Sequence, residues 1–212
     1  MHGAANKFEF VASALRRVAA QLPRRPRLLD VGCRGCELSA FVGDFADYEG
    51  LDLFQNAQGS VRHVLDVSRG MPFEDSEFDF VVGLDVLEHV DDFIGTLREL
   101  WRVSGSRLVL ILPNMAHVLH RLRFLRTGRI SPKYDLQYGA GPDRHRWFTV
   151  LDQSDRYIHE FCTENGLTLE ILWLNDTKKK DRAARVARRL GFSAQAVVWA
   201  SVYVISRSGD LR

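Results

Sequence analysis

The sequence contains little cysteine, little proline and no long apolar run. Its 212 residues include three cysteines and six prolines. Three cysteines cannot form the closed disulfide framework that holds many small secreted domains together. No stretch reaches the roughly 18 consecutive apolar residues that indicate a membrane-spanning helix, and no secretory leader is visible at the start of the chain. We therefore expect a cytoplasmic protein.

The sequence also lacks a strong excess of one charge. Its 29 Lys and Arg residues nearly balance its 27 Asp and Glu residues, which leaves a formal net charge of +2. So small an excess does not indicate a nucleic-acid-binding protein. Hydrophobic residues make up 46% of the chain and charged residues 26%, which is typical of an ordinary globular domain with a sizeable core.

Apolar runs alternate with amphipathic segments in the first half of the chain. The patterns predict helices over 6–22, 37–45 and 91–103, and strands over 27–31, 48–54, 61–67, 77–84 and 106–114. This alternation is typical of parallel β-α-β units. Ligands of such sheets bind beyond the carboxyl ends of the strands. Four acids lie at these ends: Asp30, Asp52, Asp66 and Asp85.

The pattern changes after Asn114. Residues 115–126 predict a basic amphipathic helix, and 127–148 are rich in Gly, Pro, Tyr and Arg, which indicates a cap. A helix over 151–166, a strand over 167–175, a basic helix over 177–191 and a long final strand over 193–207 are predicted to follow. We expect one domain over 1–212, divided into an N-terminal helix (1–26), a cofactor-binding core (27–114), a cap or substrate region (115–150) and the C-terminal part of the sheet (151–206).

The stretch Cys33-Arg-Gly-Cys36, between the first strand and the next helix, has several interpretations. A C-x-x-C motif there can be a redox site, because a helix N-terminus stabilises a thiolate. A zinc site would need further ligands, and no second C-x-x-C supplies them. Alternatively, Gly32 and Gly35 let the backbone turn sharply and approach a cofactor.

The ordered acids favour the cofactor interpretation. Asp52 can accept hydrogen bonds from both hydroxyls of a ribose, and Asp66 can accept one from the exocyclic amine of adenine. The dinucleotide motif G-x-G-x-x-G is absent, because Arg34 and Glu37 stand where it would need other residues. The pattern therefore indicates a nucleoside-containing cofactor other than a dinucleotide.

The segments "LLDVGC", "GLDL", "LDVSRGMPFEDSEFDFVVGLDVLEHVDD" and "LRELWRVSGSRLVLILPN" resemble class I S-adenosylmethionine-dependent methyltransferases, of the methyltransferase type 11-like kind, over residues 27–114. The resemblance implies an α/β fold with three α/β/α layers and a basic cap insertion. Its Rossmann-like seven-stranded sheet would be mostly parallel, with an antiparallel last strand. It also implies S-adenosyl-L-methionine as cofactor, held by Asp30, Gly32, Cys33, Arg34, Asp52, Leu53, Asp66, Val67, Leu84 and Asp85.

The chain departs from the family in its glycine-rich loop, D-x-G-x-G-x-G. Arg34 and Cys36 stand at the second and third glycine positions. A side chain at position 34 can obstruct the cofactor, or it can donate a charge-assisted hydrogen bond to the cofactor carboxylate. The tail from Leu112 onward resembles the MetW-like group. These two features motivate an alternative hypothesis, a catalytically inactive methyltransferase-fold binding or regulatory subunit of another enzyme.

Methyl transfer is an in-line displacement in which the enzyme aligns the nucleophile and excludes water. A hydroxyl acceptor benefits from a general base. His89 and His145 are the candidates for that base, and Asp85 is the third candidate catalytic residue. Arg144 and Arg146 are expected to bind an anionic group of the acceptor. We therefore predict O-methylation of a small or lipid-linked, anionic acceptor.

The basic segments 115–133 and 178–189 have other interpretations. They can be solvated faces, or a peripheral contact with an anionic membrane surface. We do not expect a nucleic-acid partner, because "KKKDRAARVARR" has no aromatic residue for base stacking. No metal site is predicted, since His117 and His120 have no acid near them in the sequence. The oligomeric state is left open.

Overall fold

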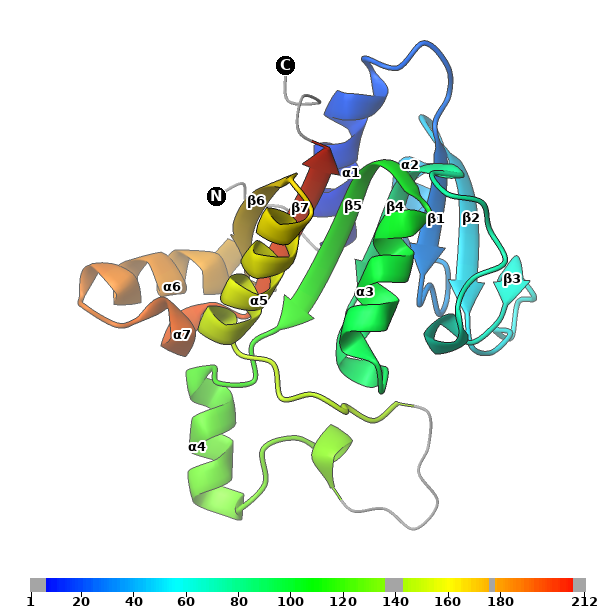
Figure 1. The fold of residues 1–212 in the computed structure, drawn as a ribbon. Coiled ribbons are helices and arrows are strands. Elements are labelled where there is room, and N and C mark those ends of the chain that lie inside the picture. The colour runs from blue at the N-terminus through cyan, green and yellow to red at the C-terminus, as the bar shows by residue number, and fades with distance from the viewer. Residues whose placement is uncertain (1–6, 136–142, 176–177, 208–212) are drawn as a thin grey trace.

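The computed structural model describes residues 7–135, 143–175 and 178–207, without the side chains of 178–181. These residues form a seven-stranded sheet with the strand order β3-β2-β1-β4-β5-β7-β6 (Figure 1). The strands are β1 (Arg27–Val31), β2 (Asp47–Asp52), β3 (His63–Val64), β4 (Phe78–Leu84), β5 (Ser104–Pro113), β6 (Leu167–Leu174) and β7 (Ala200–Arg207).

Strand directions follow the prediction. The pairs β1–β2, β1–β4, β2–β3 and β4–β5 are parallel. Within the described ranges only β7 runs the other way, antiparallel to both β5 and β6. The Rossmann-like, mostly parallel sheet with an antiparallel last strand is therefore confirmed.

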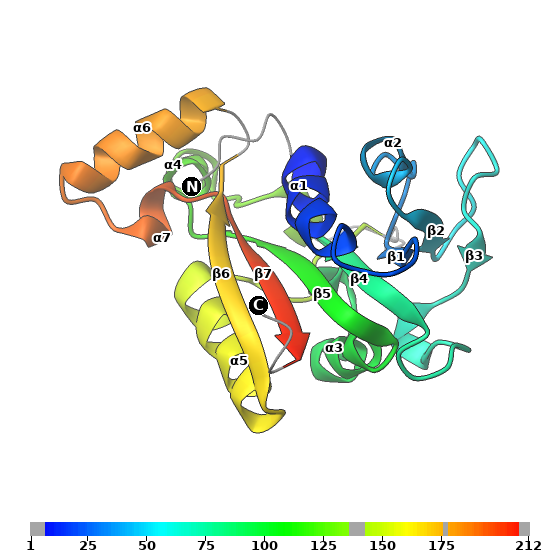
Figure 2. The same ribbon diagram turned by 90° about the horizontal axis from the view of Figure 1, so that it is seen from above.

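Helices cover both faces of the sheet, as Figure 2 shows from above. Helices α1 (Lys7–Ala19) and α2 (Ser39–Val42) pack on one face, and α3 (Phe93–Arg102) and α5 (Leu151–Glu164) pack on the other. Two hydrophobic cores result, one on each side of the strands. The central strands β1 and β4 are buried at almost every position because both of their faces are covered. The three-layer arrangement is confirmed.

Two predicted strands are shorter in the structure. In the predicted strand 61–67 only β3 pairs, because the Asp66 side chain accepts a hydrogen bond from Ser68 N and caps a short helix, η1 (Val67–Arg69). The predicted strand 193–207 begins instead with a helical turn, α7 (Ala194–Val197). The Asn114 amide donates to the Gln195 and Val198 carbonyls, which keeps them out of the β ladder.

The cap lies beyond the carboxyl ends of β4 and β5, in the lower part of Figure 1. It contains α4 (Val118–Thr127) and η3 (Pro132–Tyr134), and residues 136–142 of the predicted cap lie outside the described residues. The cap is joined to η2 (Leu87–His89), because Arg146 N and Trp147 N both donate to the Glu88 carbonyl. None of the helices in the described part, including α6 (Lys178–Arg189), has the length and apolarity needed to span a membrane.

Candidate active site

Two adjoining cavities lie at the carboxyl ends of the parallel strands. The larger, of about 400 Å³, lies beside the ends of β1 and β2 and the start of η1. The smaller, of about 270 Å³, lies between the start of α1, the loop after β1 and the end of β5. Both are lined by Gly32, Arg34 and Asp85. This is the edge of the sheet where the strand-end acids were predicted to bind a ligand.

The larger cavity contains the predicted ribose and adenine residues. Asp52, Leu53, Asp66 and Val67 all line it. One oxygen of the Asp52 carboxylate accepts a hydrogen bond of 2.8 Å from Arg34 N, which fixes the orientation of the carboxylate. A hydrogen bond from the Ser68 hydroxyl lowers the pKa of Asp66 and favours the ionised acceptor form. The cavity therefore offers two oriented carboxylates to a nucleoside.

The smaller cavity contains most of the residues predicted for the amino-acid part of the cofactor. Asp30, Gly32, Cys33, Leu84 and Asp85 line it. Gly32 has φ +73°, and a Cβ atom there would lie 2.4 Å from Val86 Cγ2, so the backbone approach needs glycine. The Asp85 carboxylate pairs at 2.7 Å with the Lys7 ammonium, which shows that its surroundings suit an ammonium group.

The C-x-x-C loop does not have the properties of a redox site. Cys33 and Cys36 are both buried, and their sulfur atoms are 3.5 Å apart. Burial raises the pKa of the Cys33 thiol, whereas redox catalysis requires a lowered one. The redox interpretation is therefore wrong. The cysteines instead pack together with Val61 beneath the loop.

The loop keeps the backbone shape that glycines would give it. Arg34 has φ +48° and Cys36 has φ +59°, so both non-glycine residues adopt the left-handed conformation. The exposed Arg34 guanidinium extends to Asp143 of the cap, 2.9 Å away. An L side chain in this region costs roughly 1–2 kcal/mol, so the loop holds some backbone strain at two positions.

Substitution of Arg34 by glycine is expected to raise the free energy of unfolding by up to about 1 kcal/mol. Relief of the positive φ outweighs both the greater freedom of glycine in the unfolded chain and the loss of an exposed ion pair. Cys36→Gly is the matched control, since it relieves a similar φ but removes a buried side chain and should destabilise the protein. Urea unfolding measures both variants. Equal destabilisation by both would contradict the strain argument.

Asp30 is a buried acid at the end of β1. Burial raises the pKa of its carboxyl to about 7, and the hydrogen bond of 2.8 Å from the Tyr48 hydroxyl opposes this shift only in part. The neutral acid is therefore favoured in the folded protein at slightly acidic pH. A cationic ligand in the smaller cavity would favour the carboxylate instead.

We expect Asp30 to lower stability as pH rises from about 4 to about 7. Below this window the carboxyl is neutral in the folded and the unfolded chain, and its contribution is fully present. Within the window Asp30 ionises in the unfolded chain but stays neutral in the folded one. The contribution of Asp30 to the free energy of unfolding therefore falls as pH rises, and it stops falling above the folded pKa. Urea unfolding of wild type and Asp30→Asn at several pH values should show this slope in the wild type and a smaller one in the variant. Parallel curves would contradict it.

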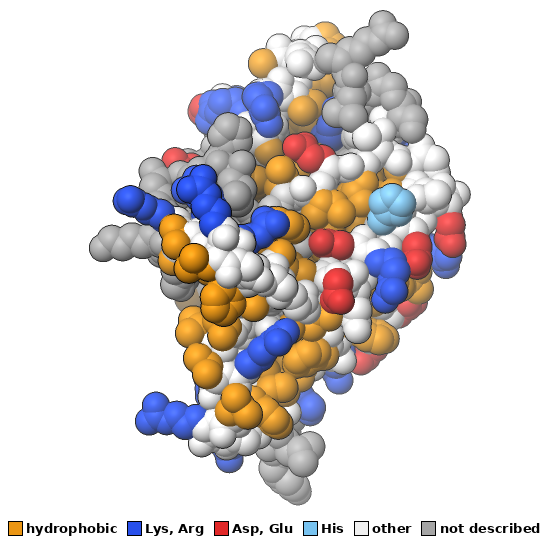
Figure 3. Space-filling model, turned by 90° about the vertical axis from the view of Figure 1, so that its left-hand side faces the viewer, with side chains coloured by type: hydrophobic (Ala, Val, Ile, Leu, Met, Phe, Trp, Pro, Cys, Tyr) orange, Lys and Arg blue, Asp and Glu red, His pale blue; other side chains and the backbone are white. Residues whose placement is uncertain are grey.

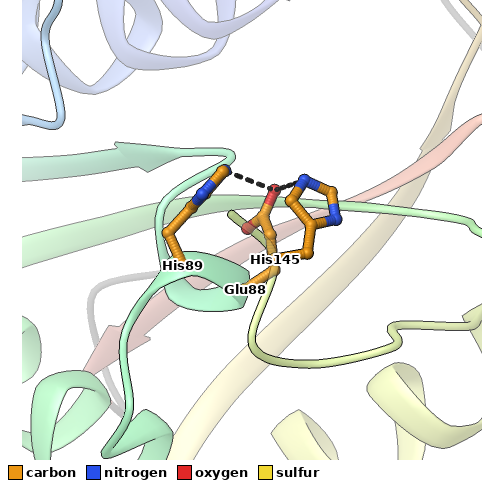
Figure 4. Close-up of side chains that lie close together, drawn as sticks. All are labelled: Glu88, His89 and His145. Carbon is orange, nitrogen blue, oxygen red and sulfur yellow. Dashed lines mark ion pairs between the residues drawn. The ribbon is translucent and has the colours of Figure 1, made fainter. Parts of the chain in front are cut away.

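Three side chains at the partition between the cavities converge on one another (Figure 4). Glu88 Oε1 lies 3.9 Å from His89 Nε2 and 4.0 Å from His145 Nε2. Glu88 is completely buried, and neither of its carboxylate oxygens has a hydrogen-bond partner among the described residues. Burial raises the pKa of Glu88 to about 8 and lowers that of His145 to about 4. Perturbed groups of this kind gather at functional sites.

The structure places the predicted catalytic residues together but separates the predicted arginines. Asp85 and His89 line the larger cavity, and Asp85 and His145 line the smaller one. Arg146 lies at the rim of the larger cavity and pairs with Asp91 at 3.3 Å. Arg144 lines neither cavity, and its carbonyl accepts a hydrogen bond from His89.

Three residues of the site were not predicted from the sequence. Lys7 and Lys133 are cations that line the smaller cavity, and Glu88 lies at its wall. Lys7 meets Asp85 across 78 positions of sequence, and nothing in its local pattern indicates this. Glu88 could have been predicted as a site residue, because it is an acid next to His89 in the loop that follows a buried strand.

Comparisons with known proteins agree with this architecture. Residues 4–170 match the family described as methyltransferase domain. The ajmaline N-methyltransferase of Rauvolfia serpentina is 25% identical over 171 residues, which are 80% of this chain and 55% of that protein. The chain thus spans about half the length of this curated relative.

Solved structures share the fold at low sequence identity. An S-adenosylmethionine-dependent methyltransferase from Archaeoglobus fulgidus has a TM-score of 0.57 and 16% identity, and covers 95% of each chain. The plantazolicin methyltransferase BpumL, solved in complex with a triazolic desmethylPZN analogue and S-adenosylhomocysteine, has a TM-score of 0.56 and 11% identity. The match covers 95% of this chain and 86% of that chain. The resemblance of the tail to the MetW-like group stays a prediction.

Proposed function

The chain belongs to the methyltransferase domain family, whose cofactor is S-adenosyl-L-methionine, and from this premise we propose that it transfers a methyl group to an oxygen atom of an anionic acceptor. The acceptor is small or lipid-linked. The observation that carries the proposal is the group formed by Glu88, His89 and His145, of which Glu88 and His145 are buried, at the partition between the two cavities.

The residues of the larger cavity fit the nucleoside part of the cofactor. Asp52 can accept from the two ribose hydroxyls, and Asp66 and Val67, which line the same cavity, can contact the adenine. Gly32 permits the cofactor to approach the backbone closely. Asp85, which pairs with the Lys7 ammonium in this structure, can hold the amino group of the cofactor in the same way. Bound there, the cofactor supplies an electrophilic methyl group, and the protein aligns an acceptor with it.

An oxygen acceptor suits the polar atoms around the partition. The Glu88 oxygens and His89 Nε2 are buried and have no hydrogen-bond partner among the described residues. Such atoms can orient a hydroxyl group and take up its proton. We assign His89, His145 and Asp85 to the activation of the acceptor, with Glu88 beside them.

An anionic acceptor suits the lysines of the smaller cavity. Lys7 of α1 and Lys133 of the cap both line this cavity. Lys133 pairs with Asp143 at 3.0 Å, so an anion bound there would compete for a partly exposed ammonium. Arg146, at the rim of the larger cavity, stays a candidate for the same role.

A lipid-linked acceptor is supported by the outer surface of the cap. None of the α4 residues is buried, and Leu125 is 80% exposed. Figure 3 shows hydrophobic side chains and basic side chains interspersed on the side of the molecule that carries α4 and α6. The exposed apolar side chains there are Leu119, Leu122, Phe124, Leu125, Val186, Leu190 and Phe192. Because His120 of the same helix lines the smaller cavity, a lipid chain on α4 would lie beside its acceptor group.

Transfer of label from methyl-labelled S-adenosylmethionine tests the proposal. We expect labelled product with anionic phenols, hydroxy acids or prenyl-linked phenols, recovered as an ether or ester. Lys133→Glu should raise the KM for such acceptors at least tenfold and leave cofactor affinity unchanged. Lys7, the other lysine of the smaller cavity, is kept in this variant. Product formed only with amines, or no product with any acceptor despite cofactor binding, would overturn the proposal of oxygen methylation.

A further inference from the structure

The cluster Glu88, His89 and His145 has the composition of a metal site. One ligand-type atom from each of the three residues lies within 4.8 Å of the other two, and Glu88 and His145 are buried (Figure 4). We propose that this cluster binds one divalent transition-metal ion. The sequence did not predict this, because His145 lies 56 positions beyond His89 and enters the site from the cap.

The hydrogen bonds of the two histidines leave the correct nitrogen free on each ring. His89 Nδ1 lies 3.0 Å from the Arg144 carbonyl, which can only accept, so Nδ1 carries the proton. The Tyr134 hydroxyl donates to the Trp147 carbonyl, so its oxygen accepts from His145 Nδ1, 3.1 Å away. Both Nε2 atoms therefore carry a lone pair, and both lie on the side of Glu88 Oε1.

Three ligand-type atoms thus meet with no hydrogen bond between them. Neither Glu88 oxygen has a hydrogen-bond partner among the described residues, and the same is true of His89 Nε2. The separations of 3.9 and 4.0 Å are too long for a hydrogen bond. A cation placed among them satisfies all three at once.

The distances are close to those that an ion requires. Ligand atoms bound tetrahedrally at about 2.1 Å lie about 3.4 Å from one another. The nitrogen–oxygen separations must therefore shorten by roughly half an ångström, which small side-chain rotations can supply. The supporting contacts are already present, since metal-binding histidines donate their other ring N–H to a carbonyl or a similar acceptor.

The donor set selects the class of ion. Two imidazole nitrogens and one carboxylate suit Zn²⁺, Fe²⁺ or Co²⁺, whereas Mg²⁺ and Ca²⁺ prefer a shell of oxygen atoms. The remaining coordination positions face the cavities, because Glu88 and His145 line the smaller one and His89 the larger. With the ion held by Glu88, His89 and His145, these three residues would activate the acceptor through the ion rather than as free bases, and an acceptor hydroxyl bound there would release its proton to solvent more readily. This role deepens, and rests on, the proposed function.

Metal binding is tested on the full chain without any acceptor. After dialysis against a chelator, calorimetric titration with Zn²⁺ should show one site per chain with micromolar or tighter affinity. Titration with Co²⁺ should produce visible absorption bands of nitrogen- and oxygen-coordinated cobalt, which need no variant to interpret. The affinity should fall at least 100-fold in His89→Ala and in His145→Ala.

His159→Ala, which removes an exposed histidine of α5, is the matched control and should bind as the wild type does. Circular dichroism checks that the site variants are folded. No binding by the wild type, or equal binding by the site variants and the control, would overturn the inference. Because the titration uses no acceptor, metal binding without methyl transfer would contradict the proposed function alone, and methyl transfer by a protein that binds no metal would contradict this inference alone.

Discussion

Replacement of Asp52 by alanine is expected to weaken S-adenosylmethionine binding by at least about 100-fold, since two hydrogen bonds to a charged group contribute about 1.5–3 kcal/mol each. Asp52 ends β2, lines the larger cavity and is oriented by the Arg34 backbone amide. Its carboxylate can accept from both ribose hydroxyls. Asp52→Asn keeps one acceptor oxygen and should weaken binding by about tenfold. Calorimetric titration with S-adenosylmethionine and with S-adenosylhomocysteine measures both variants.

The same strand supplies the matched control. Asp47, the first residue of β2, is exposed and pairs with Arg25 at the opposite edge of the sheet, roughly 16 Å from Asp52. Asp47→Ala changes the charge of the chain equally but should leave cofactor affinity unchanged. If Asp52→Ala binds the cofactor as tightly as Asp47→Ala does, the cofactor does not occupy the larger cavity in the orientation assigned here. Absence of binding of either compound to the wild type would instead favour the hypothesis of a binding or regulatory subunit.

Replacement of Glu88 by methionine is expected to stabilise the metal-free protein and to abolish methyl transfer. A buried polar group without partners costs about 1–3 kcal/mol, and an apolar side chain of similar length removes this cost. Glu88 is completely buried, and its two oxygens have no hydrogen-bond partner among the described residues. The free energy of unfolding should therefore rise by about 1–3 kcal/mol while activity falls at least 100-fold, as for other residues kept for function at the expense of stability.

Glu88→Gln separates the two effects. Glutamine keeps polar atoms at the same place, so it should not stabilise the protein, but it removes the carboxylate and should reduce activity. Urea unfolding in the presence of a chelator measures stability, and label transfer from S-adenosylmethionine measures activity. A methionine variant that is less stable than the wild type would show that Glu88 has a structural partner, and an active methionine variant would remove Glu88 from the reaction.

The sequence by itself determined the sheet and the cofactor side of the site. Strands β1 and β4 are short apolar runs that stop at a glycine or an acid, and both properties are local. Parallel strands place their carboxyl ends along one edge, so Asp30, Asp52 and Asp85 had to lie near one another once the strands were recognised. Gly32 was predictable for the same reason, since a sharp turn after a buried strand requires a positive φ.

The sequence was less informative where tertiary contacts override local pattern. The run 193–207 is apolar enough for one long strand, yet Asn114 holds the carbonyls of Gln195 and Val198, and the strand begins only at Ala200. The C-x-x-C motif, considered without its structural surroundings, is compatible with a redox site. Only burial of both thiols, which raises the pKa of Cys33, shows that the cysteines pack beneath the loop.

Only the tertiary structure decided the acceptor side of the site. Lys7 meets Asp85 from a helix at the start of the chain, and His145 meets Glu88 from the cap. Such contacts depend on how a helix and an irregular segment pack over the sheet, which no periodicity of the sequence encodes. The proton positions on His89 and His145 follow from carbonyl and hydroxyl partners that are distant in sequence. For this reason the cofactor residues could be named from the sequence, whereas the grouping of Glu88 with two histidines required the fold.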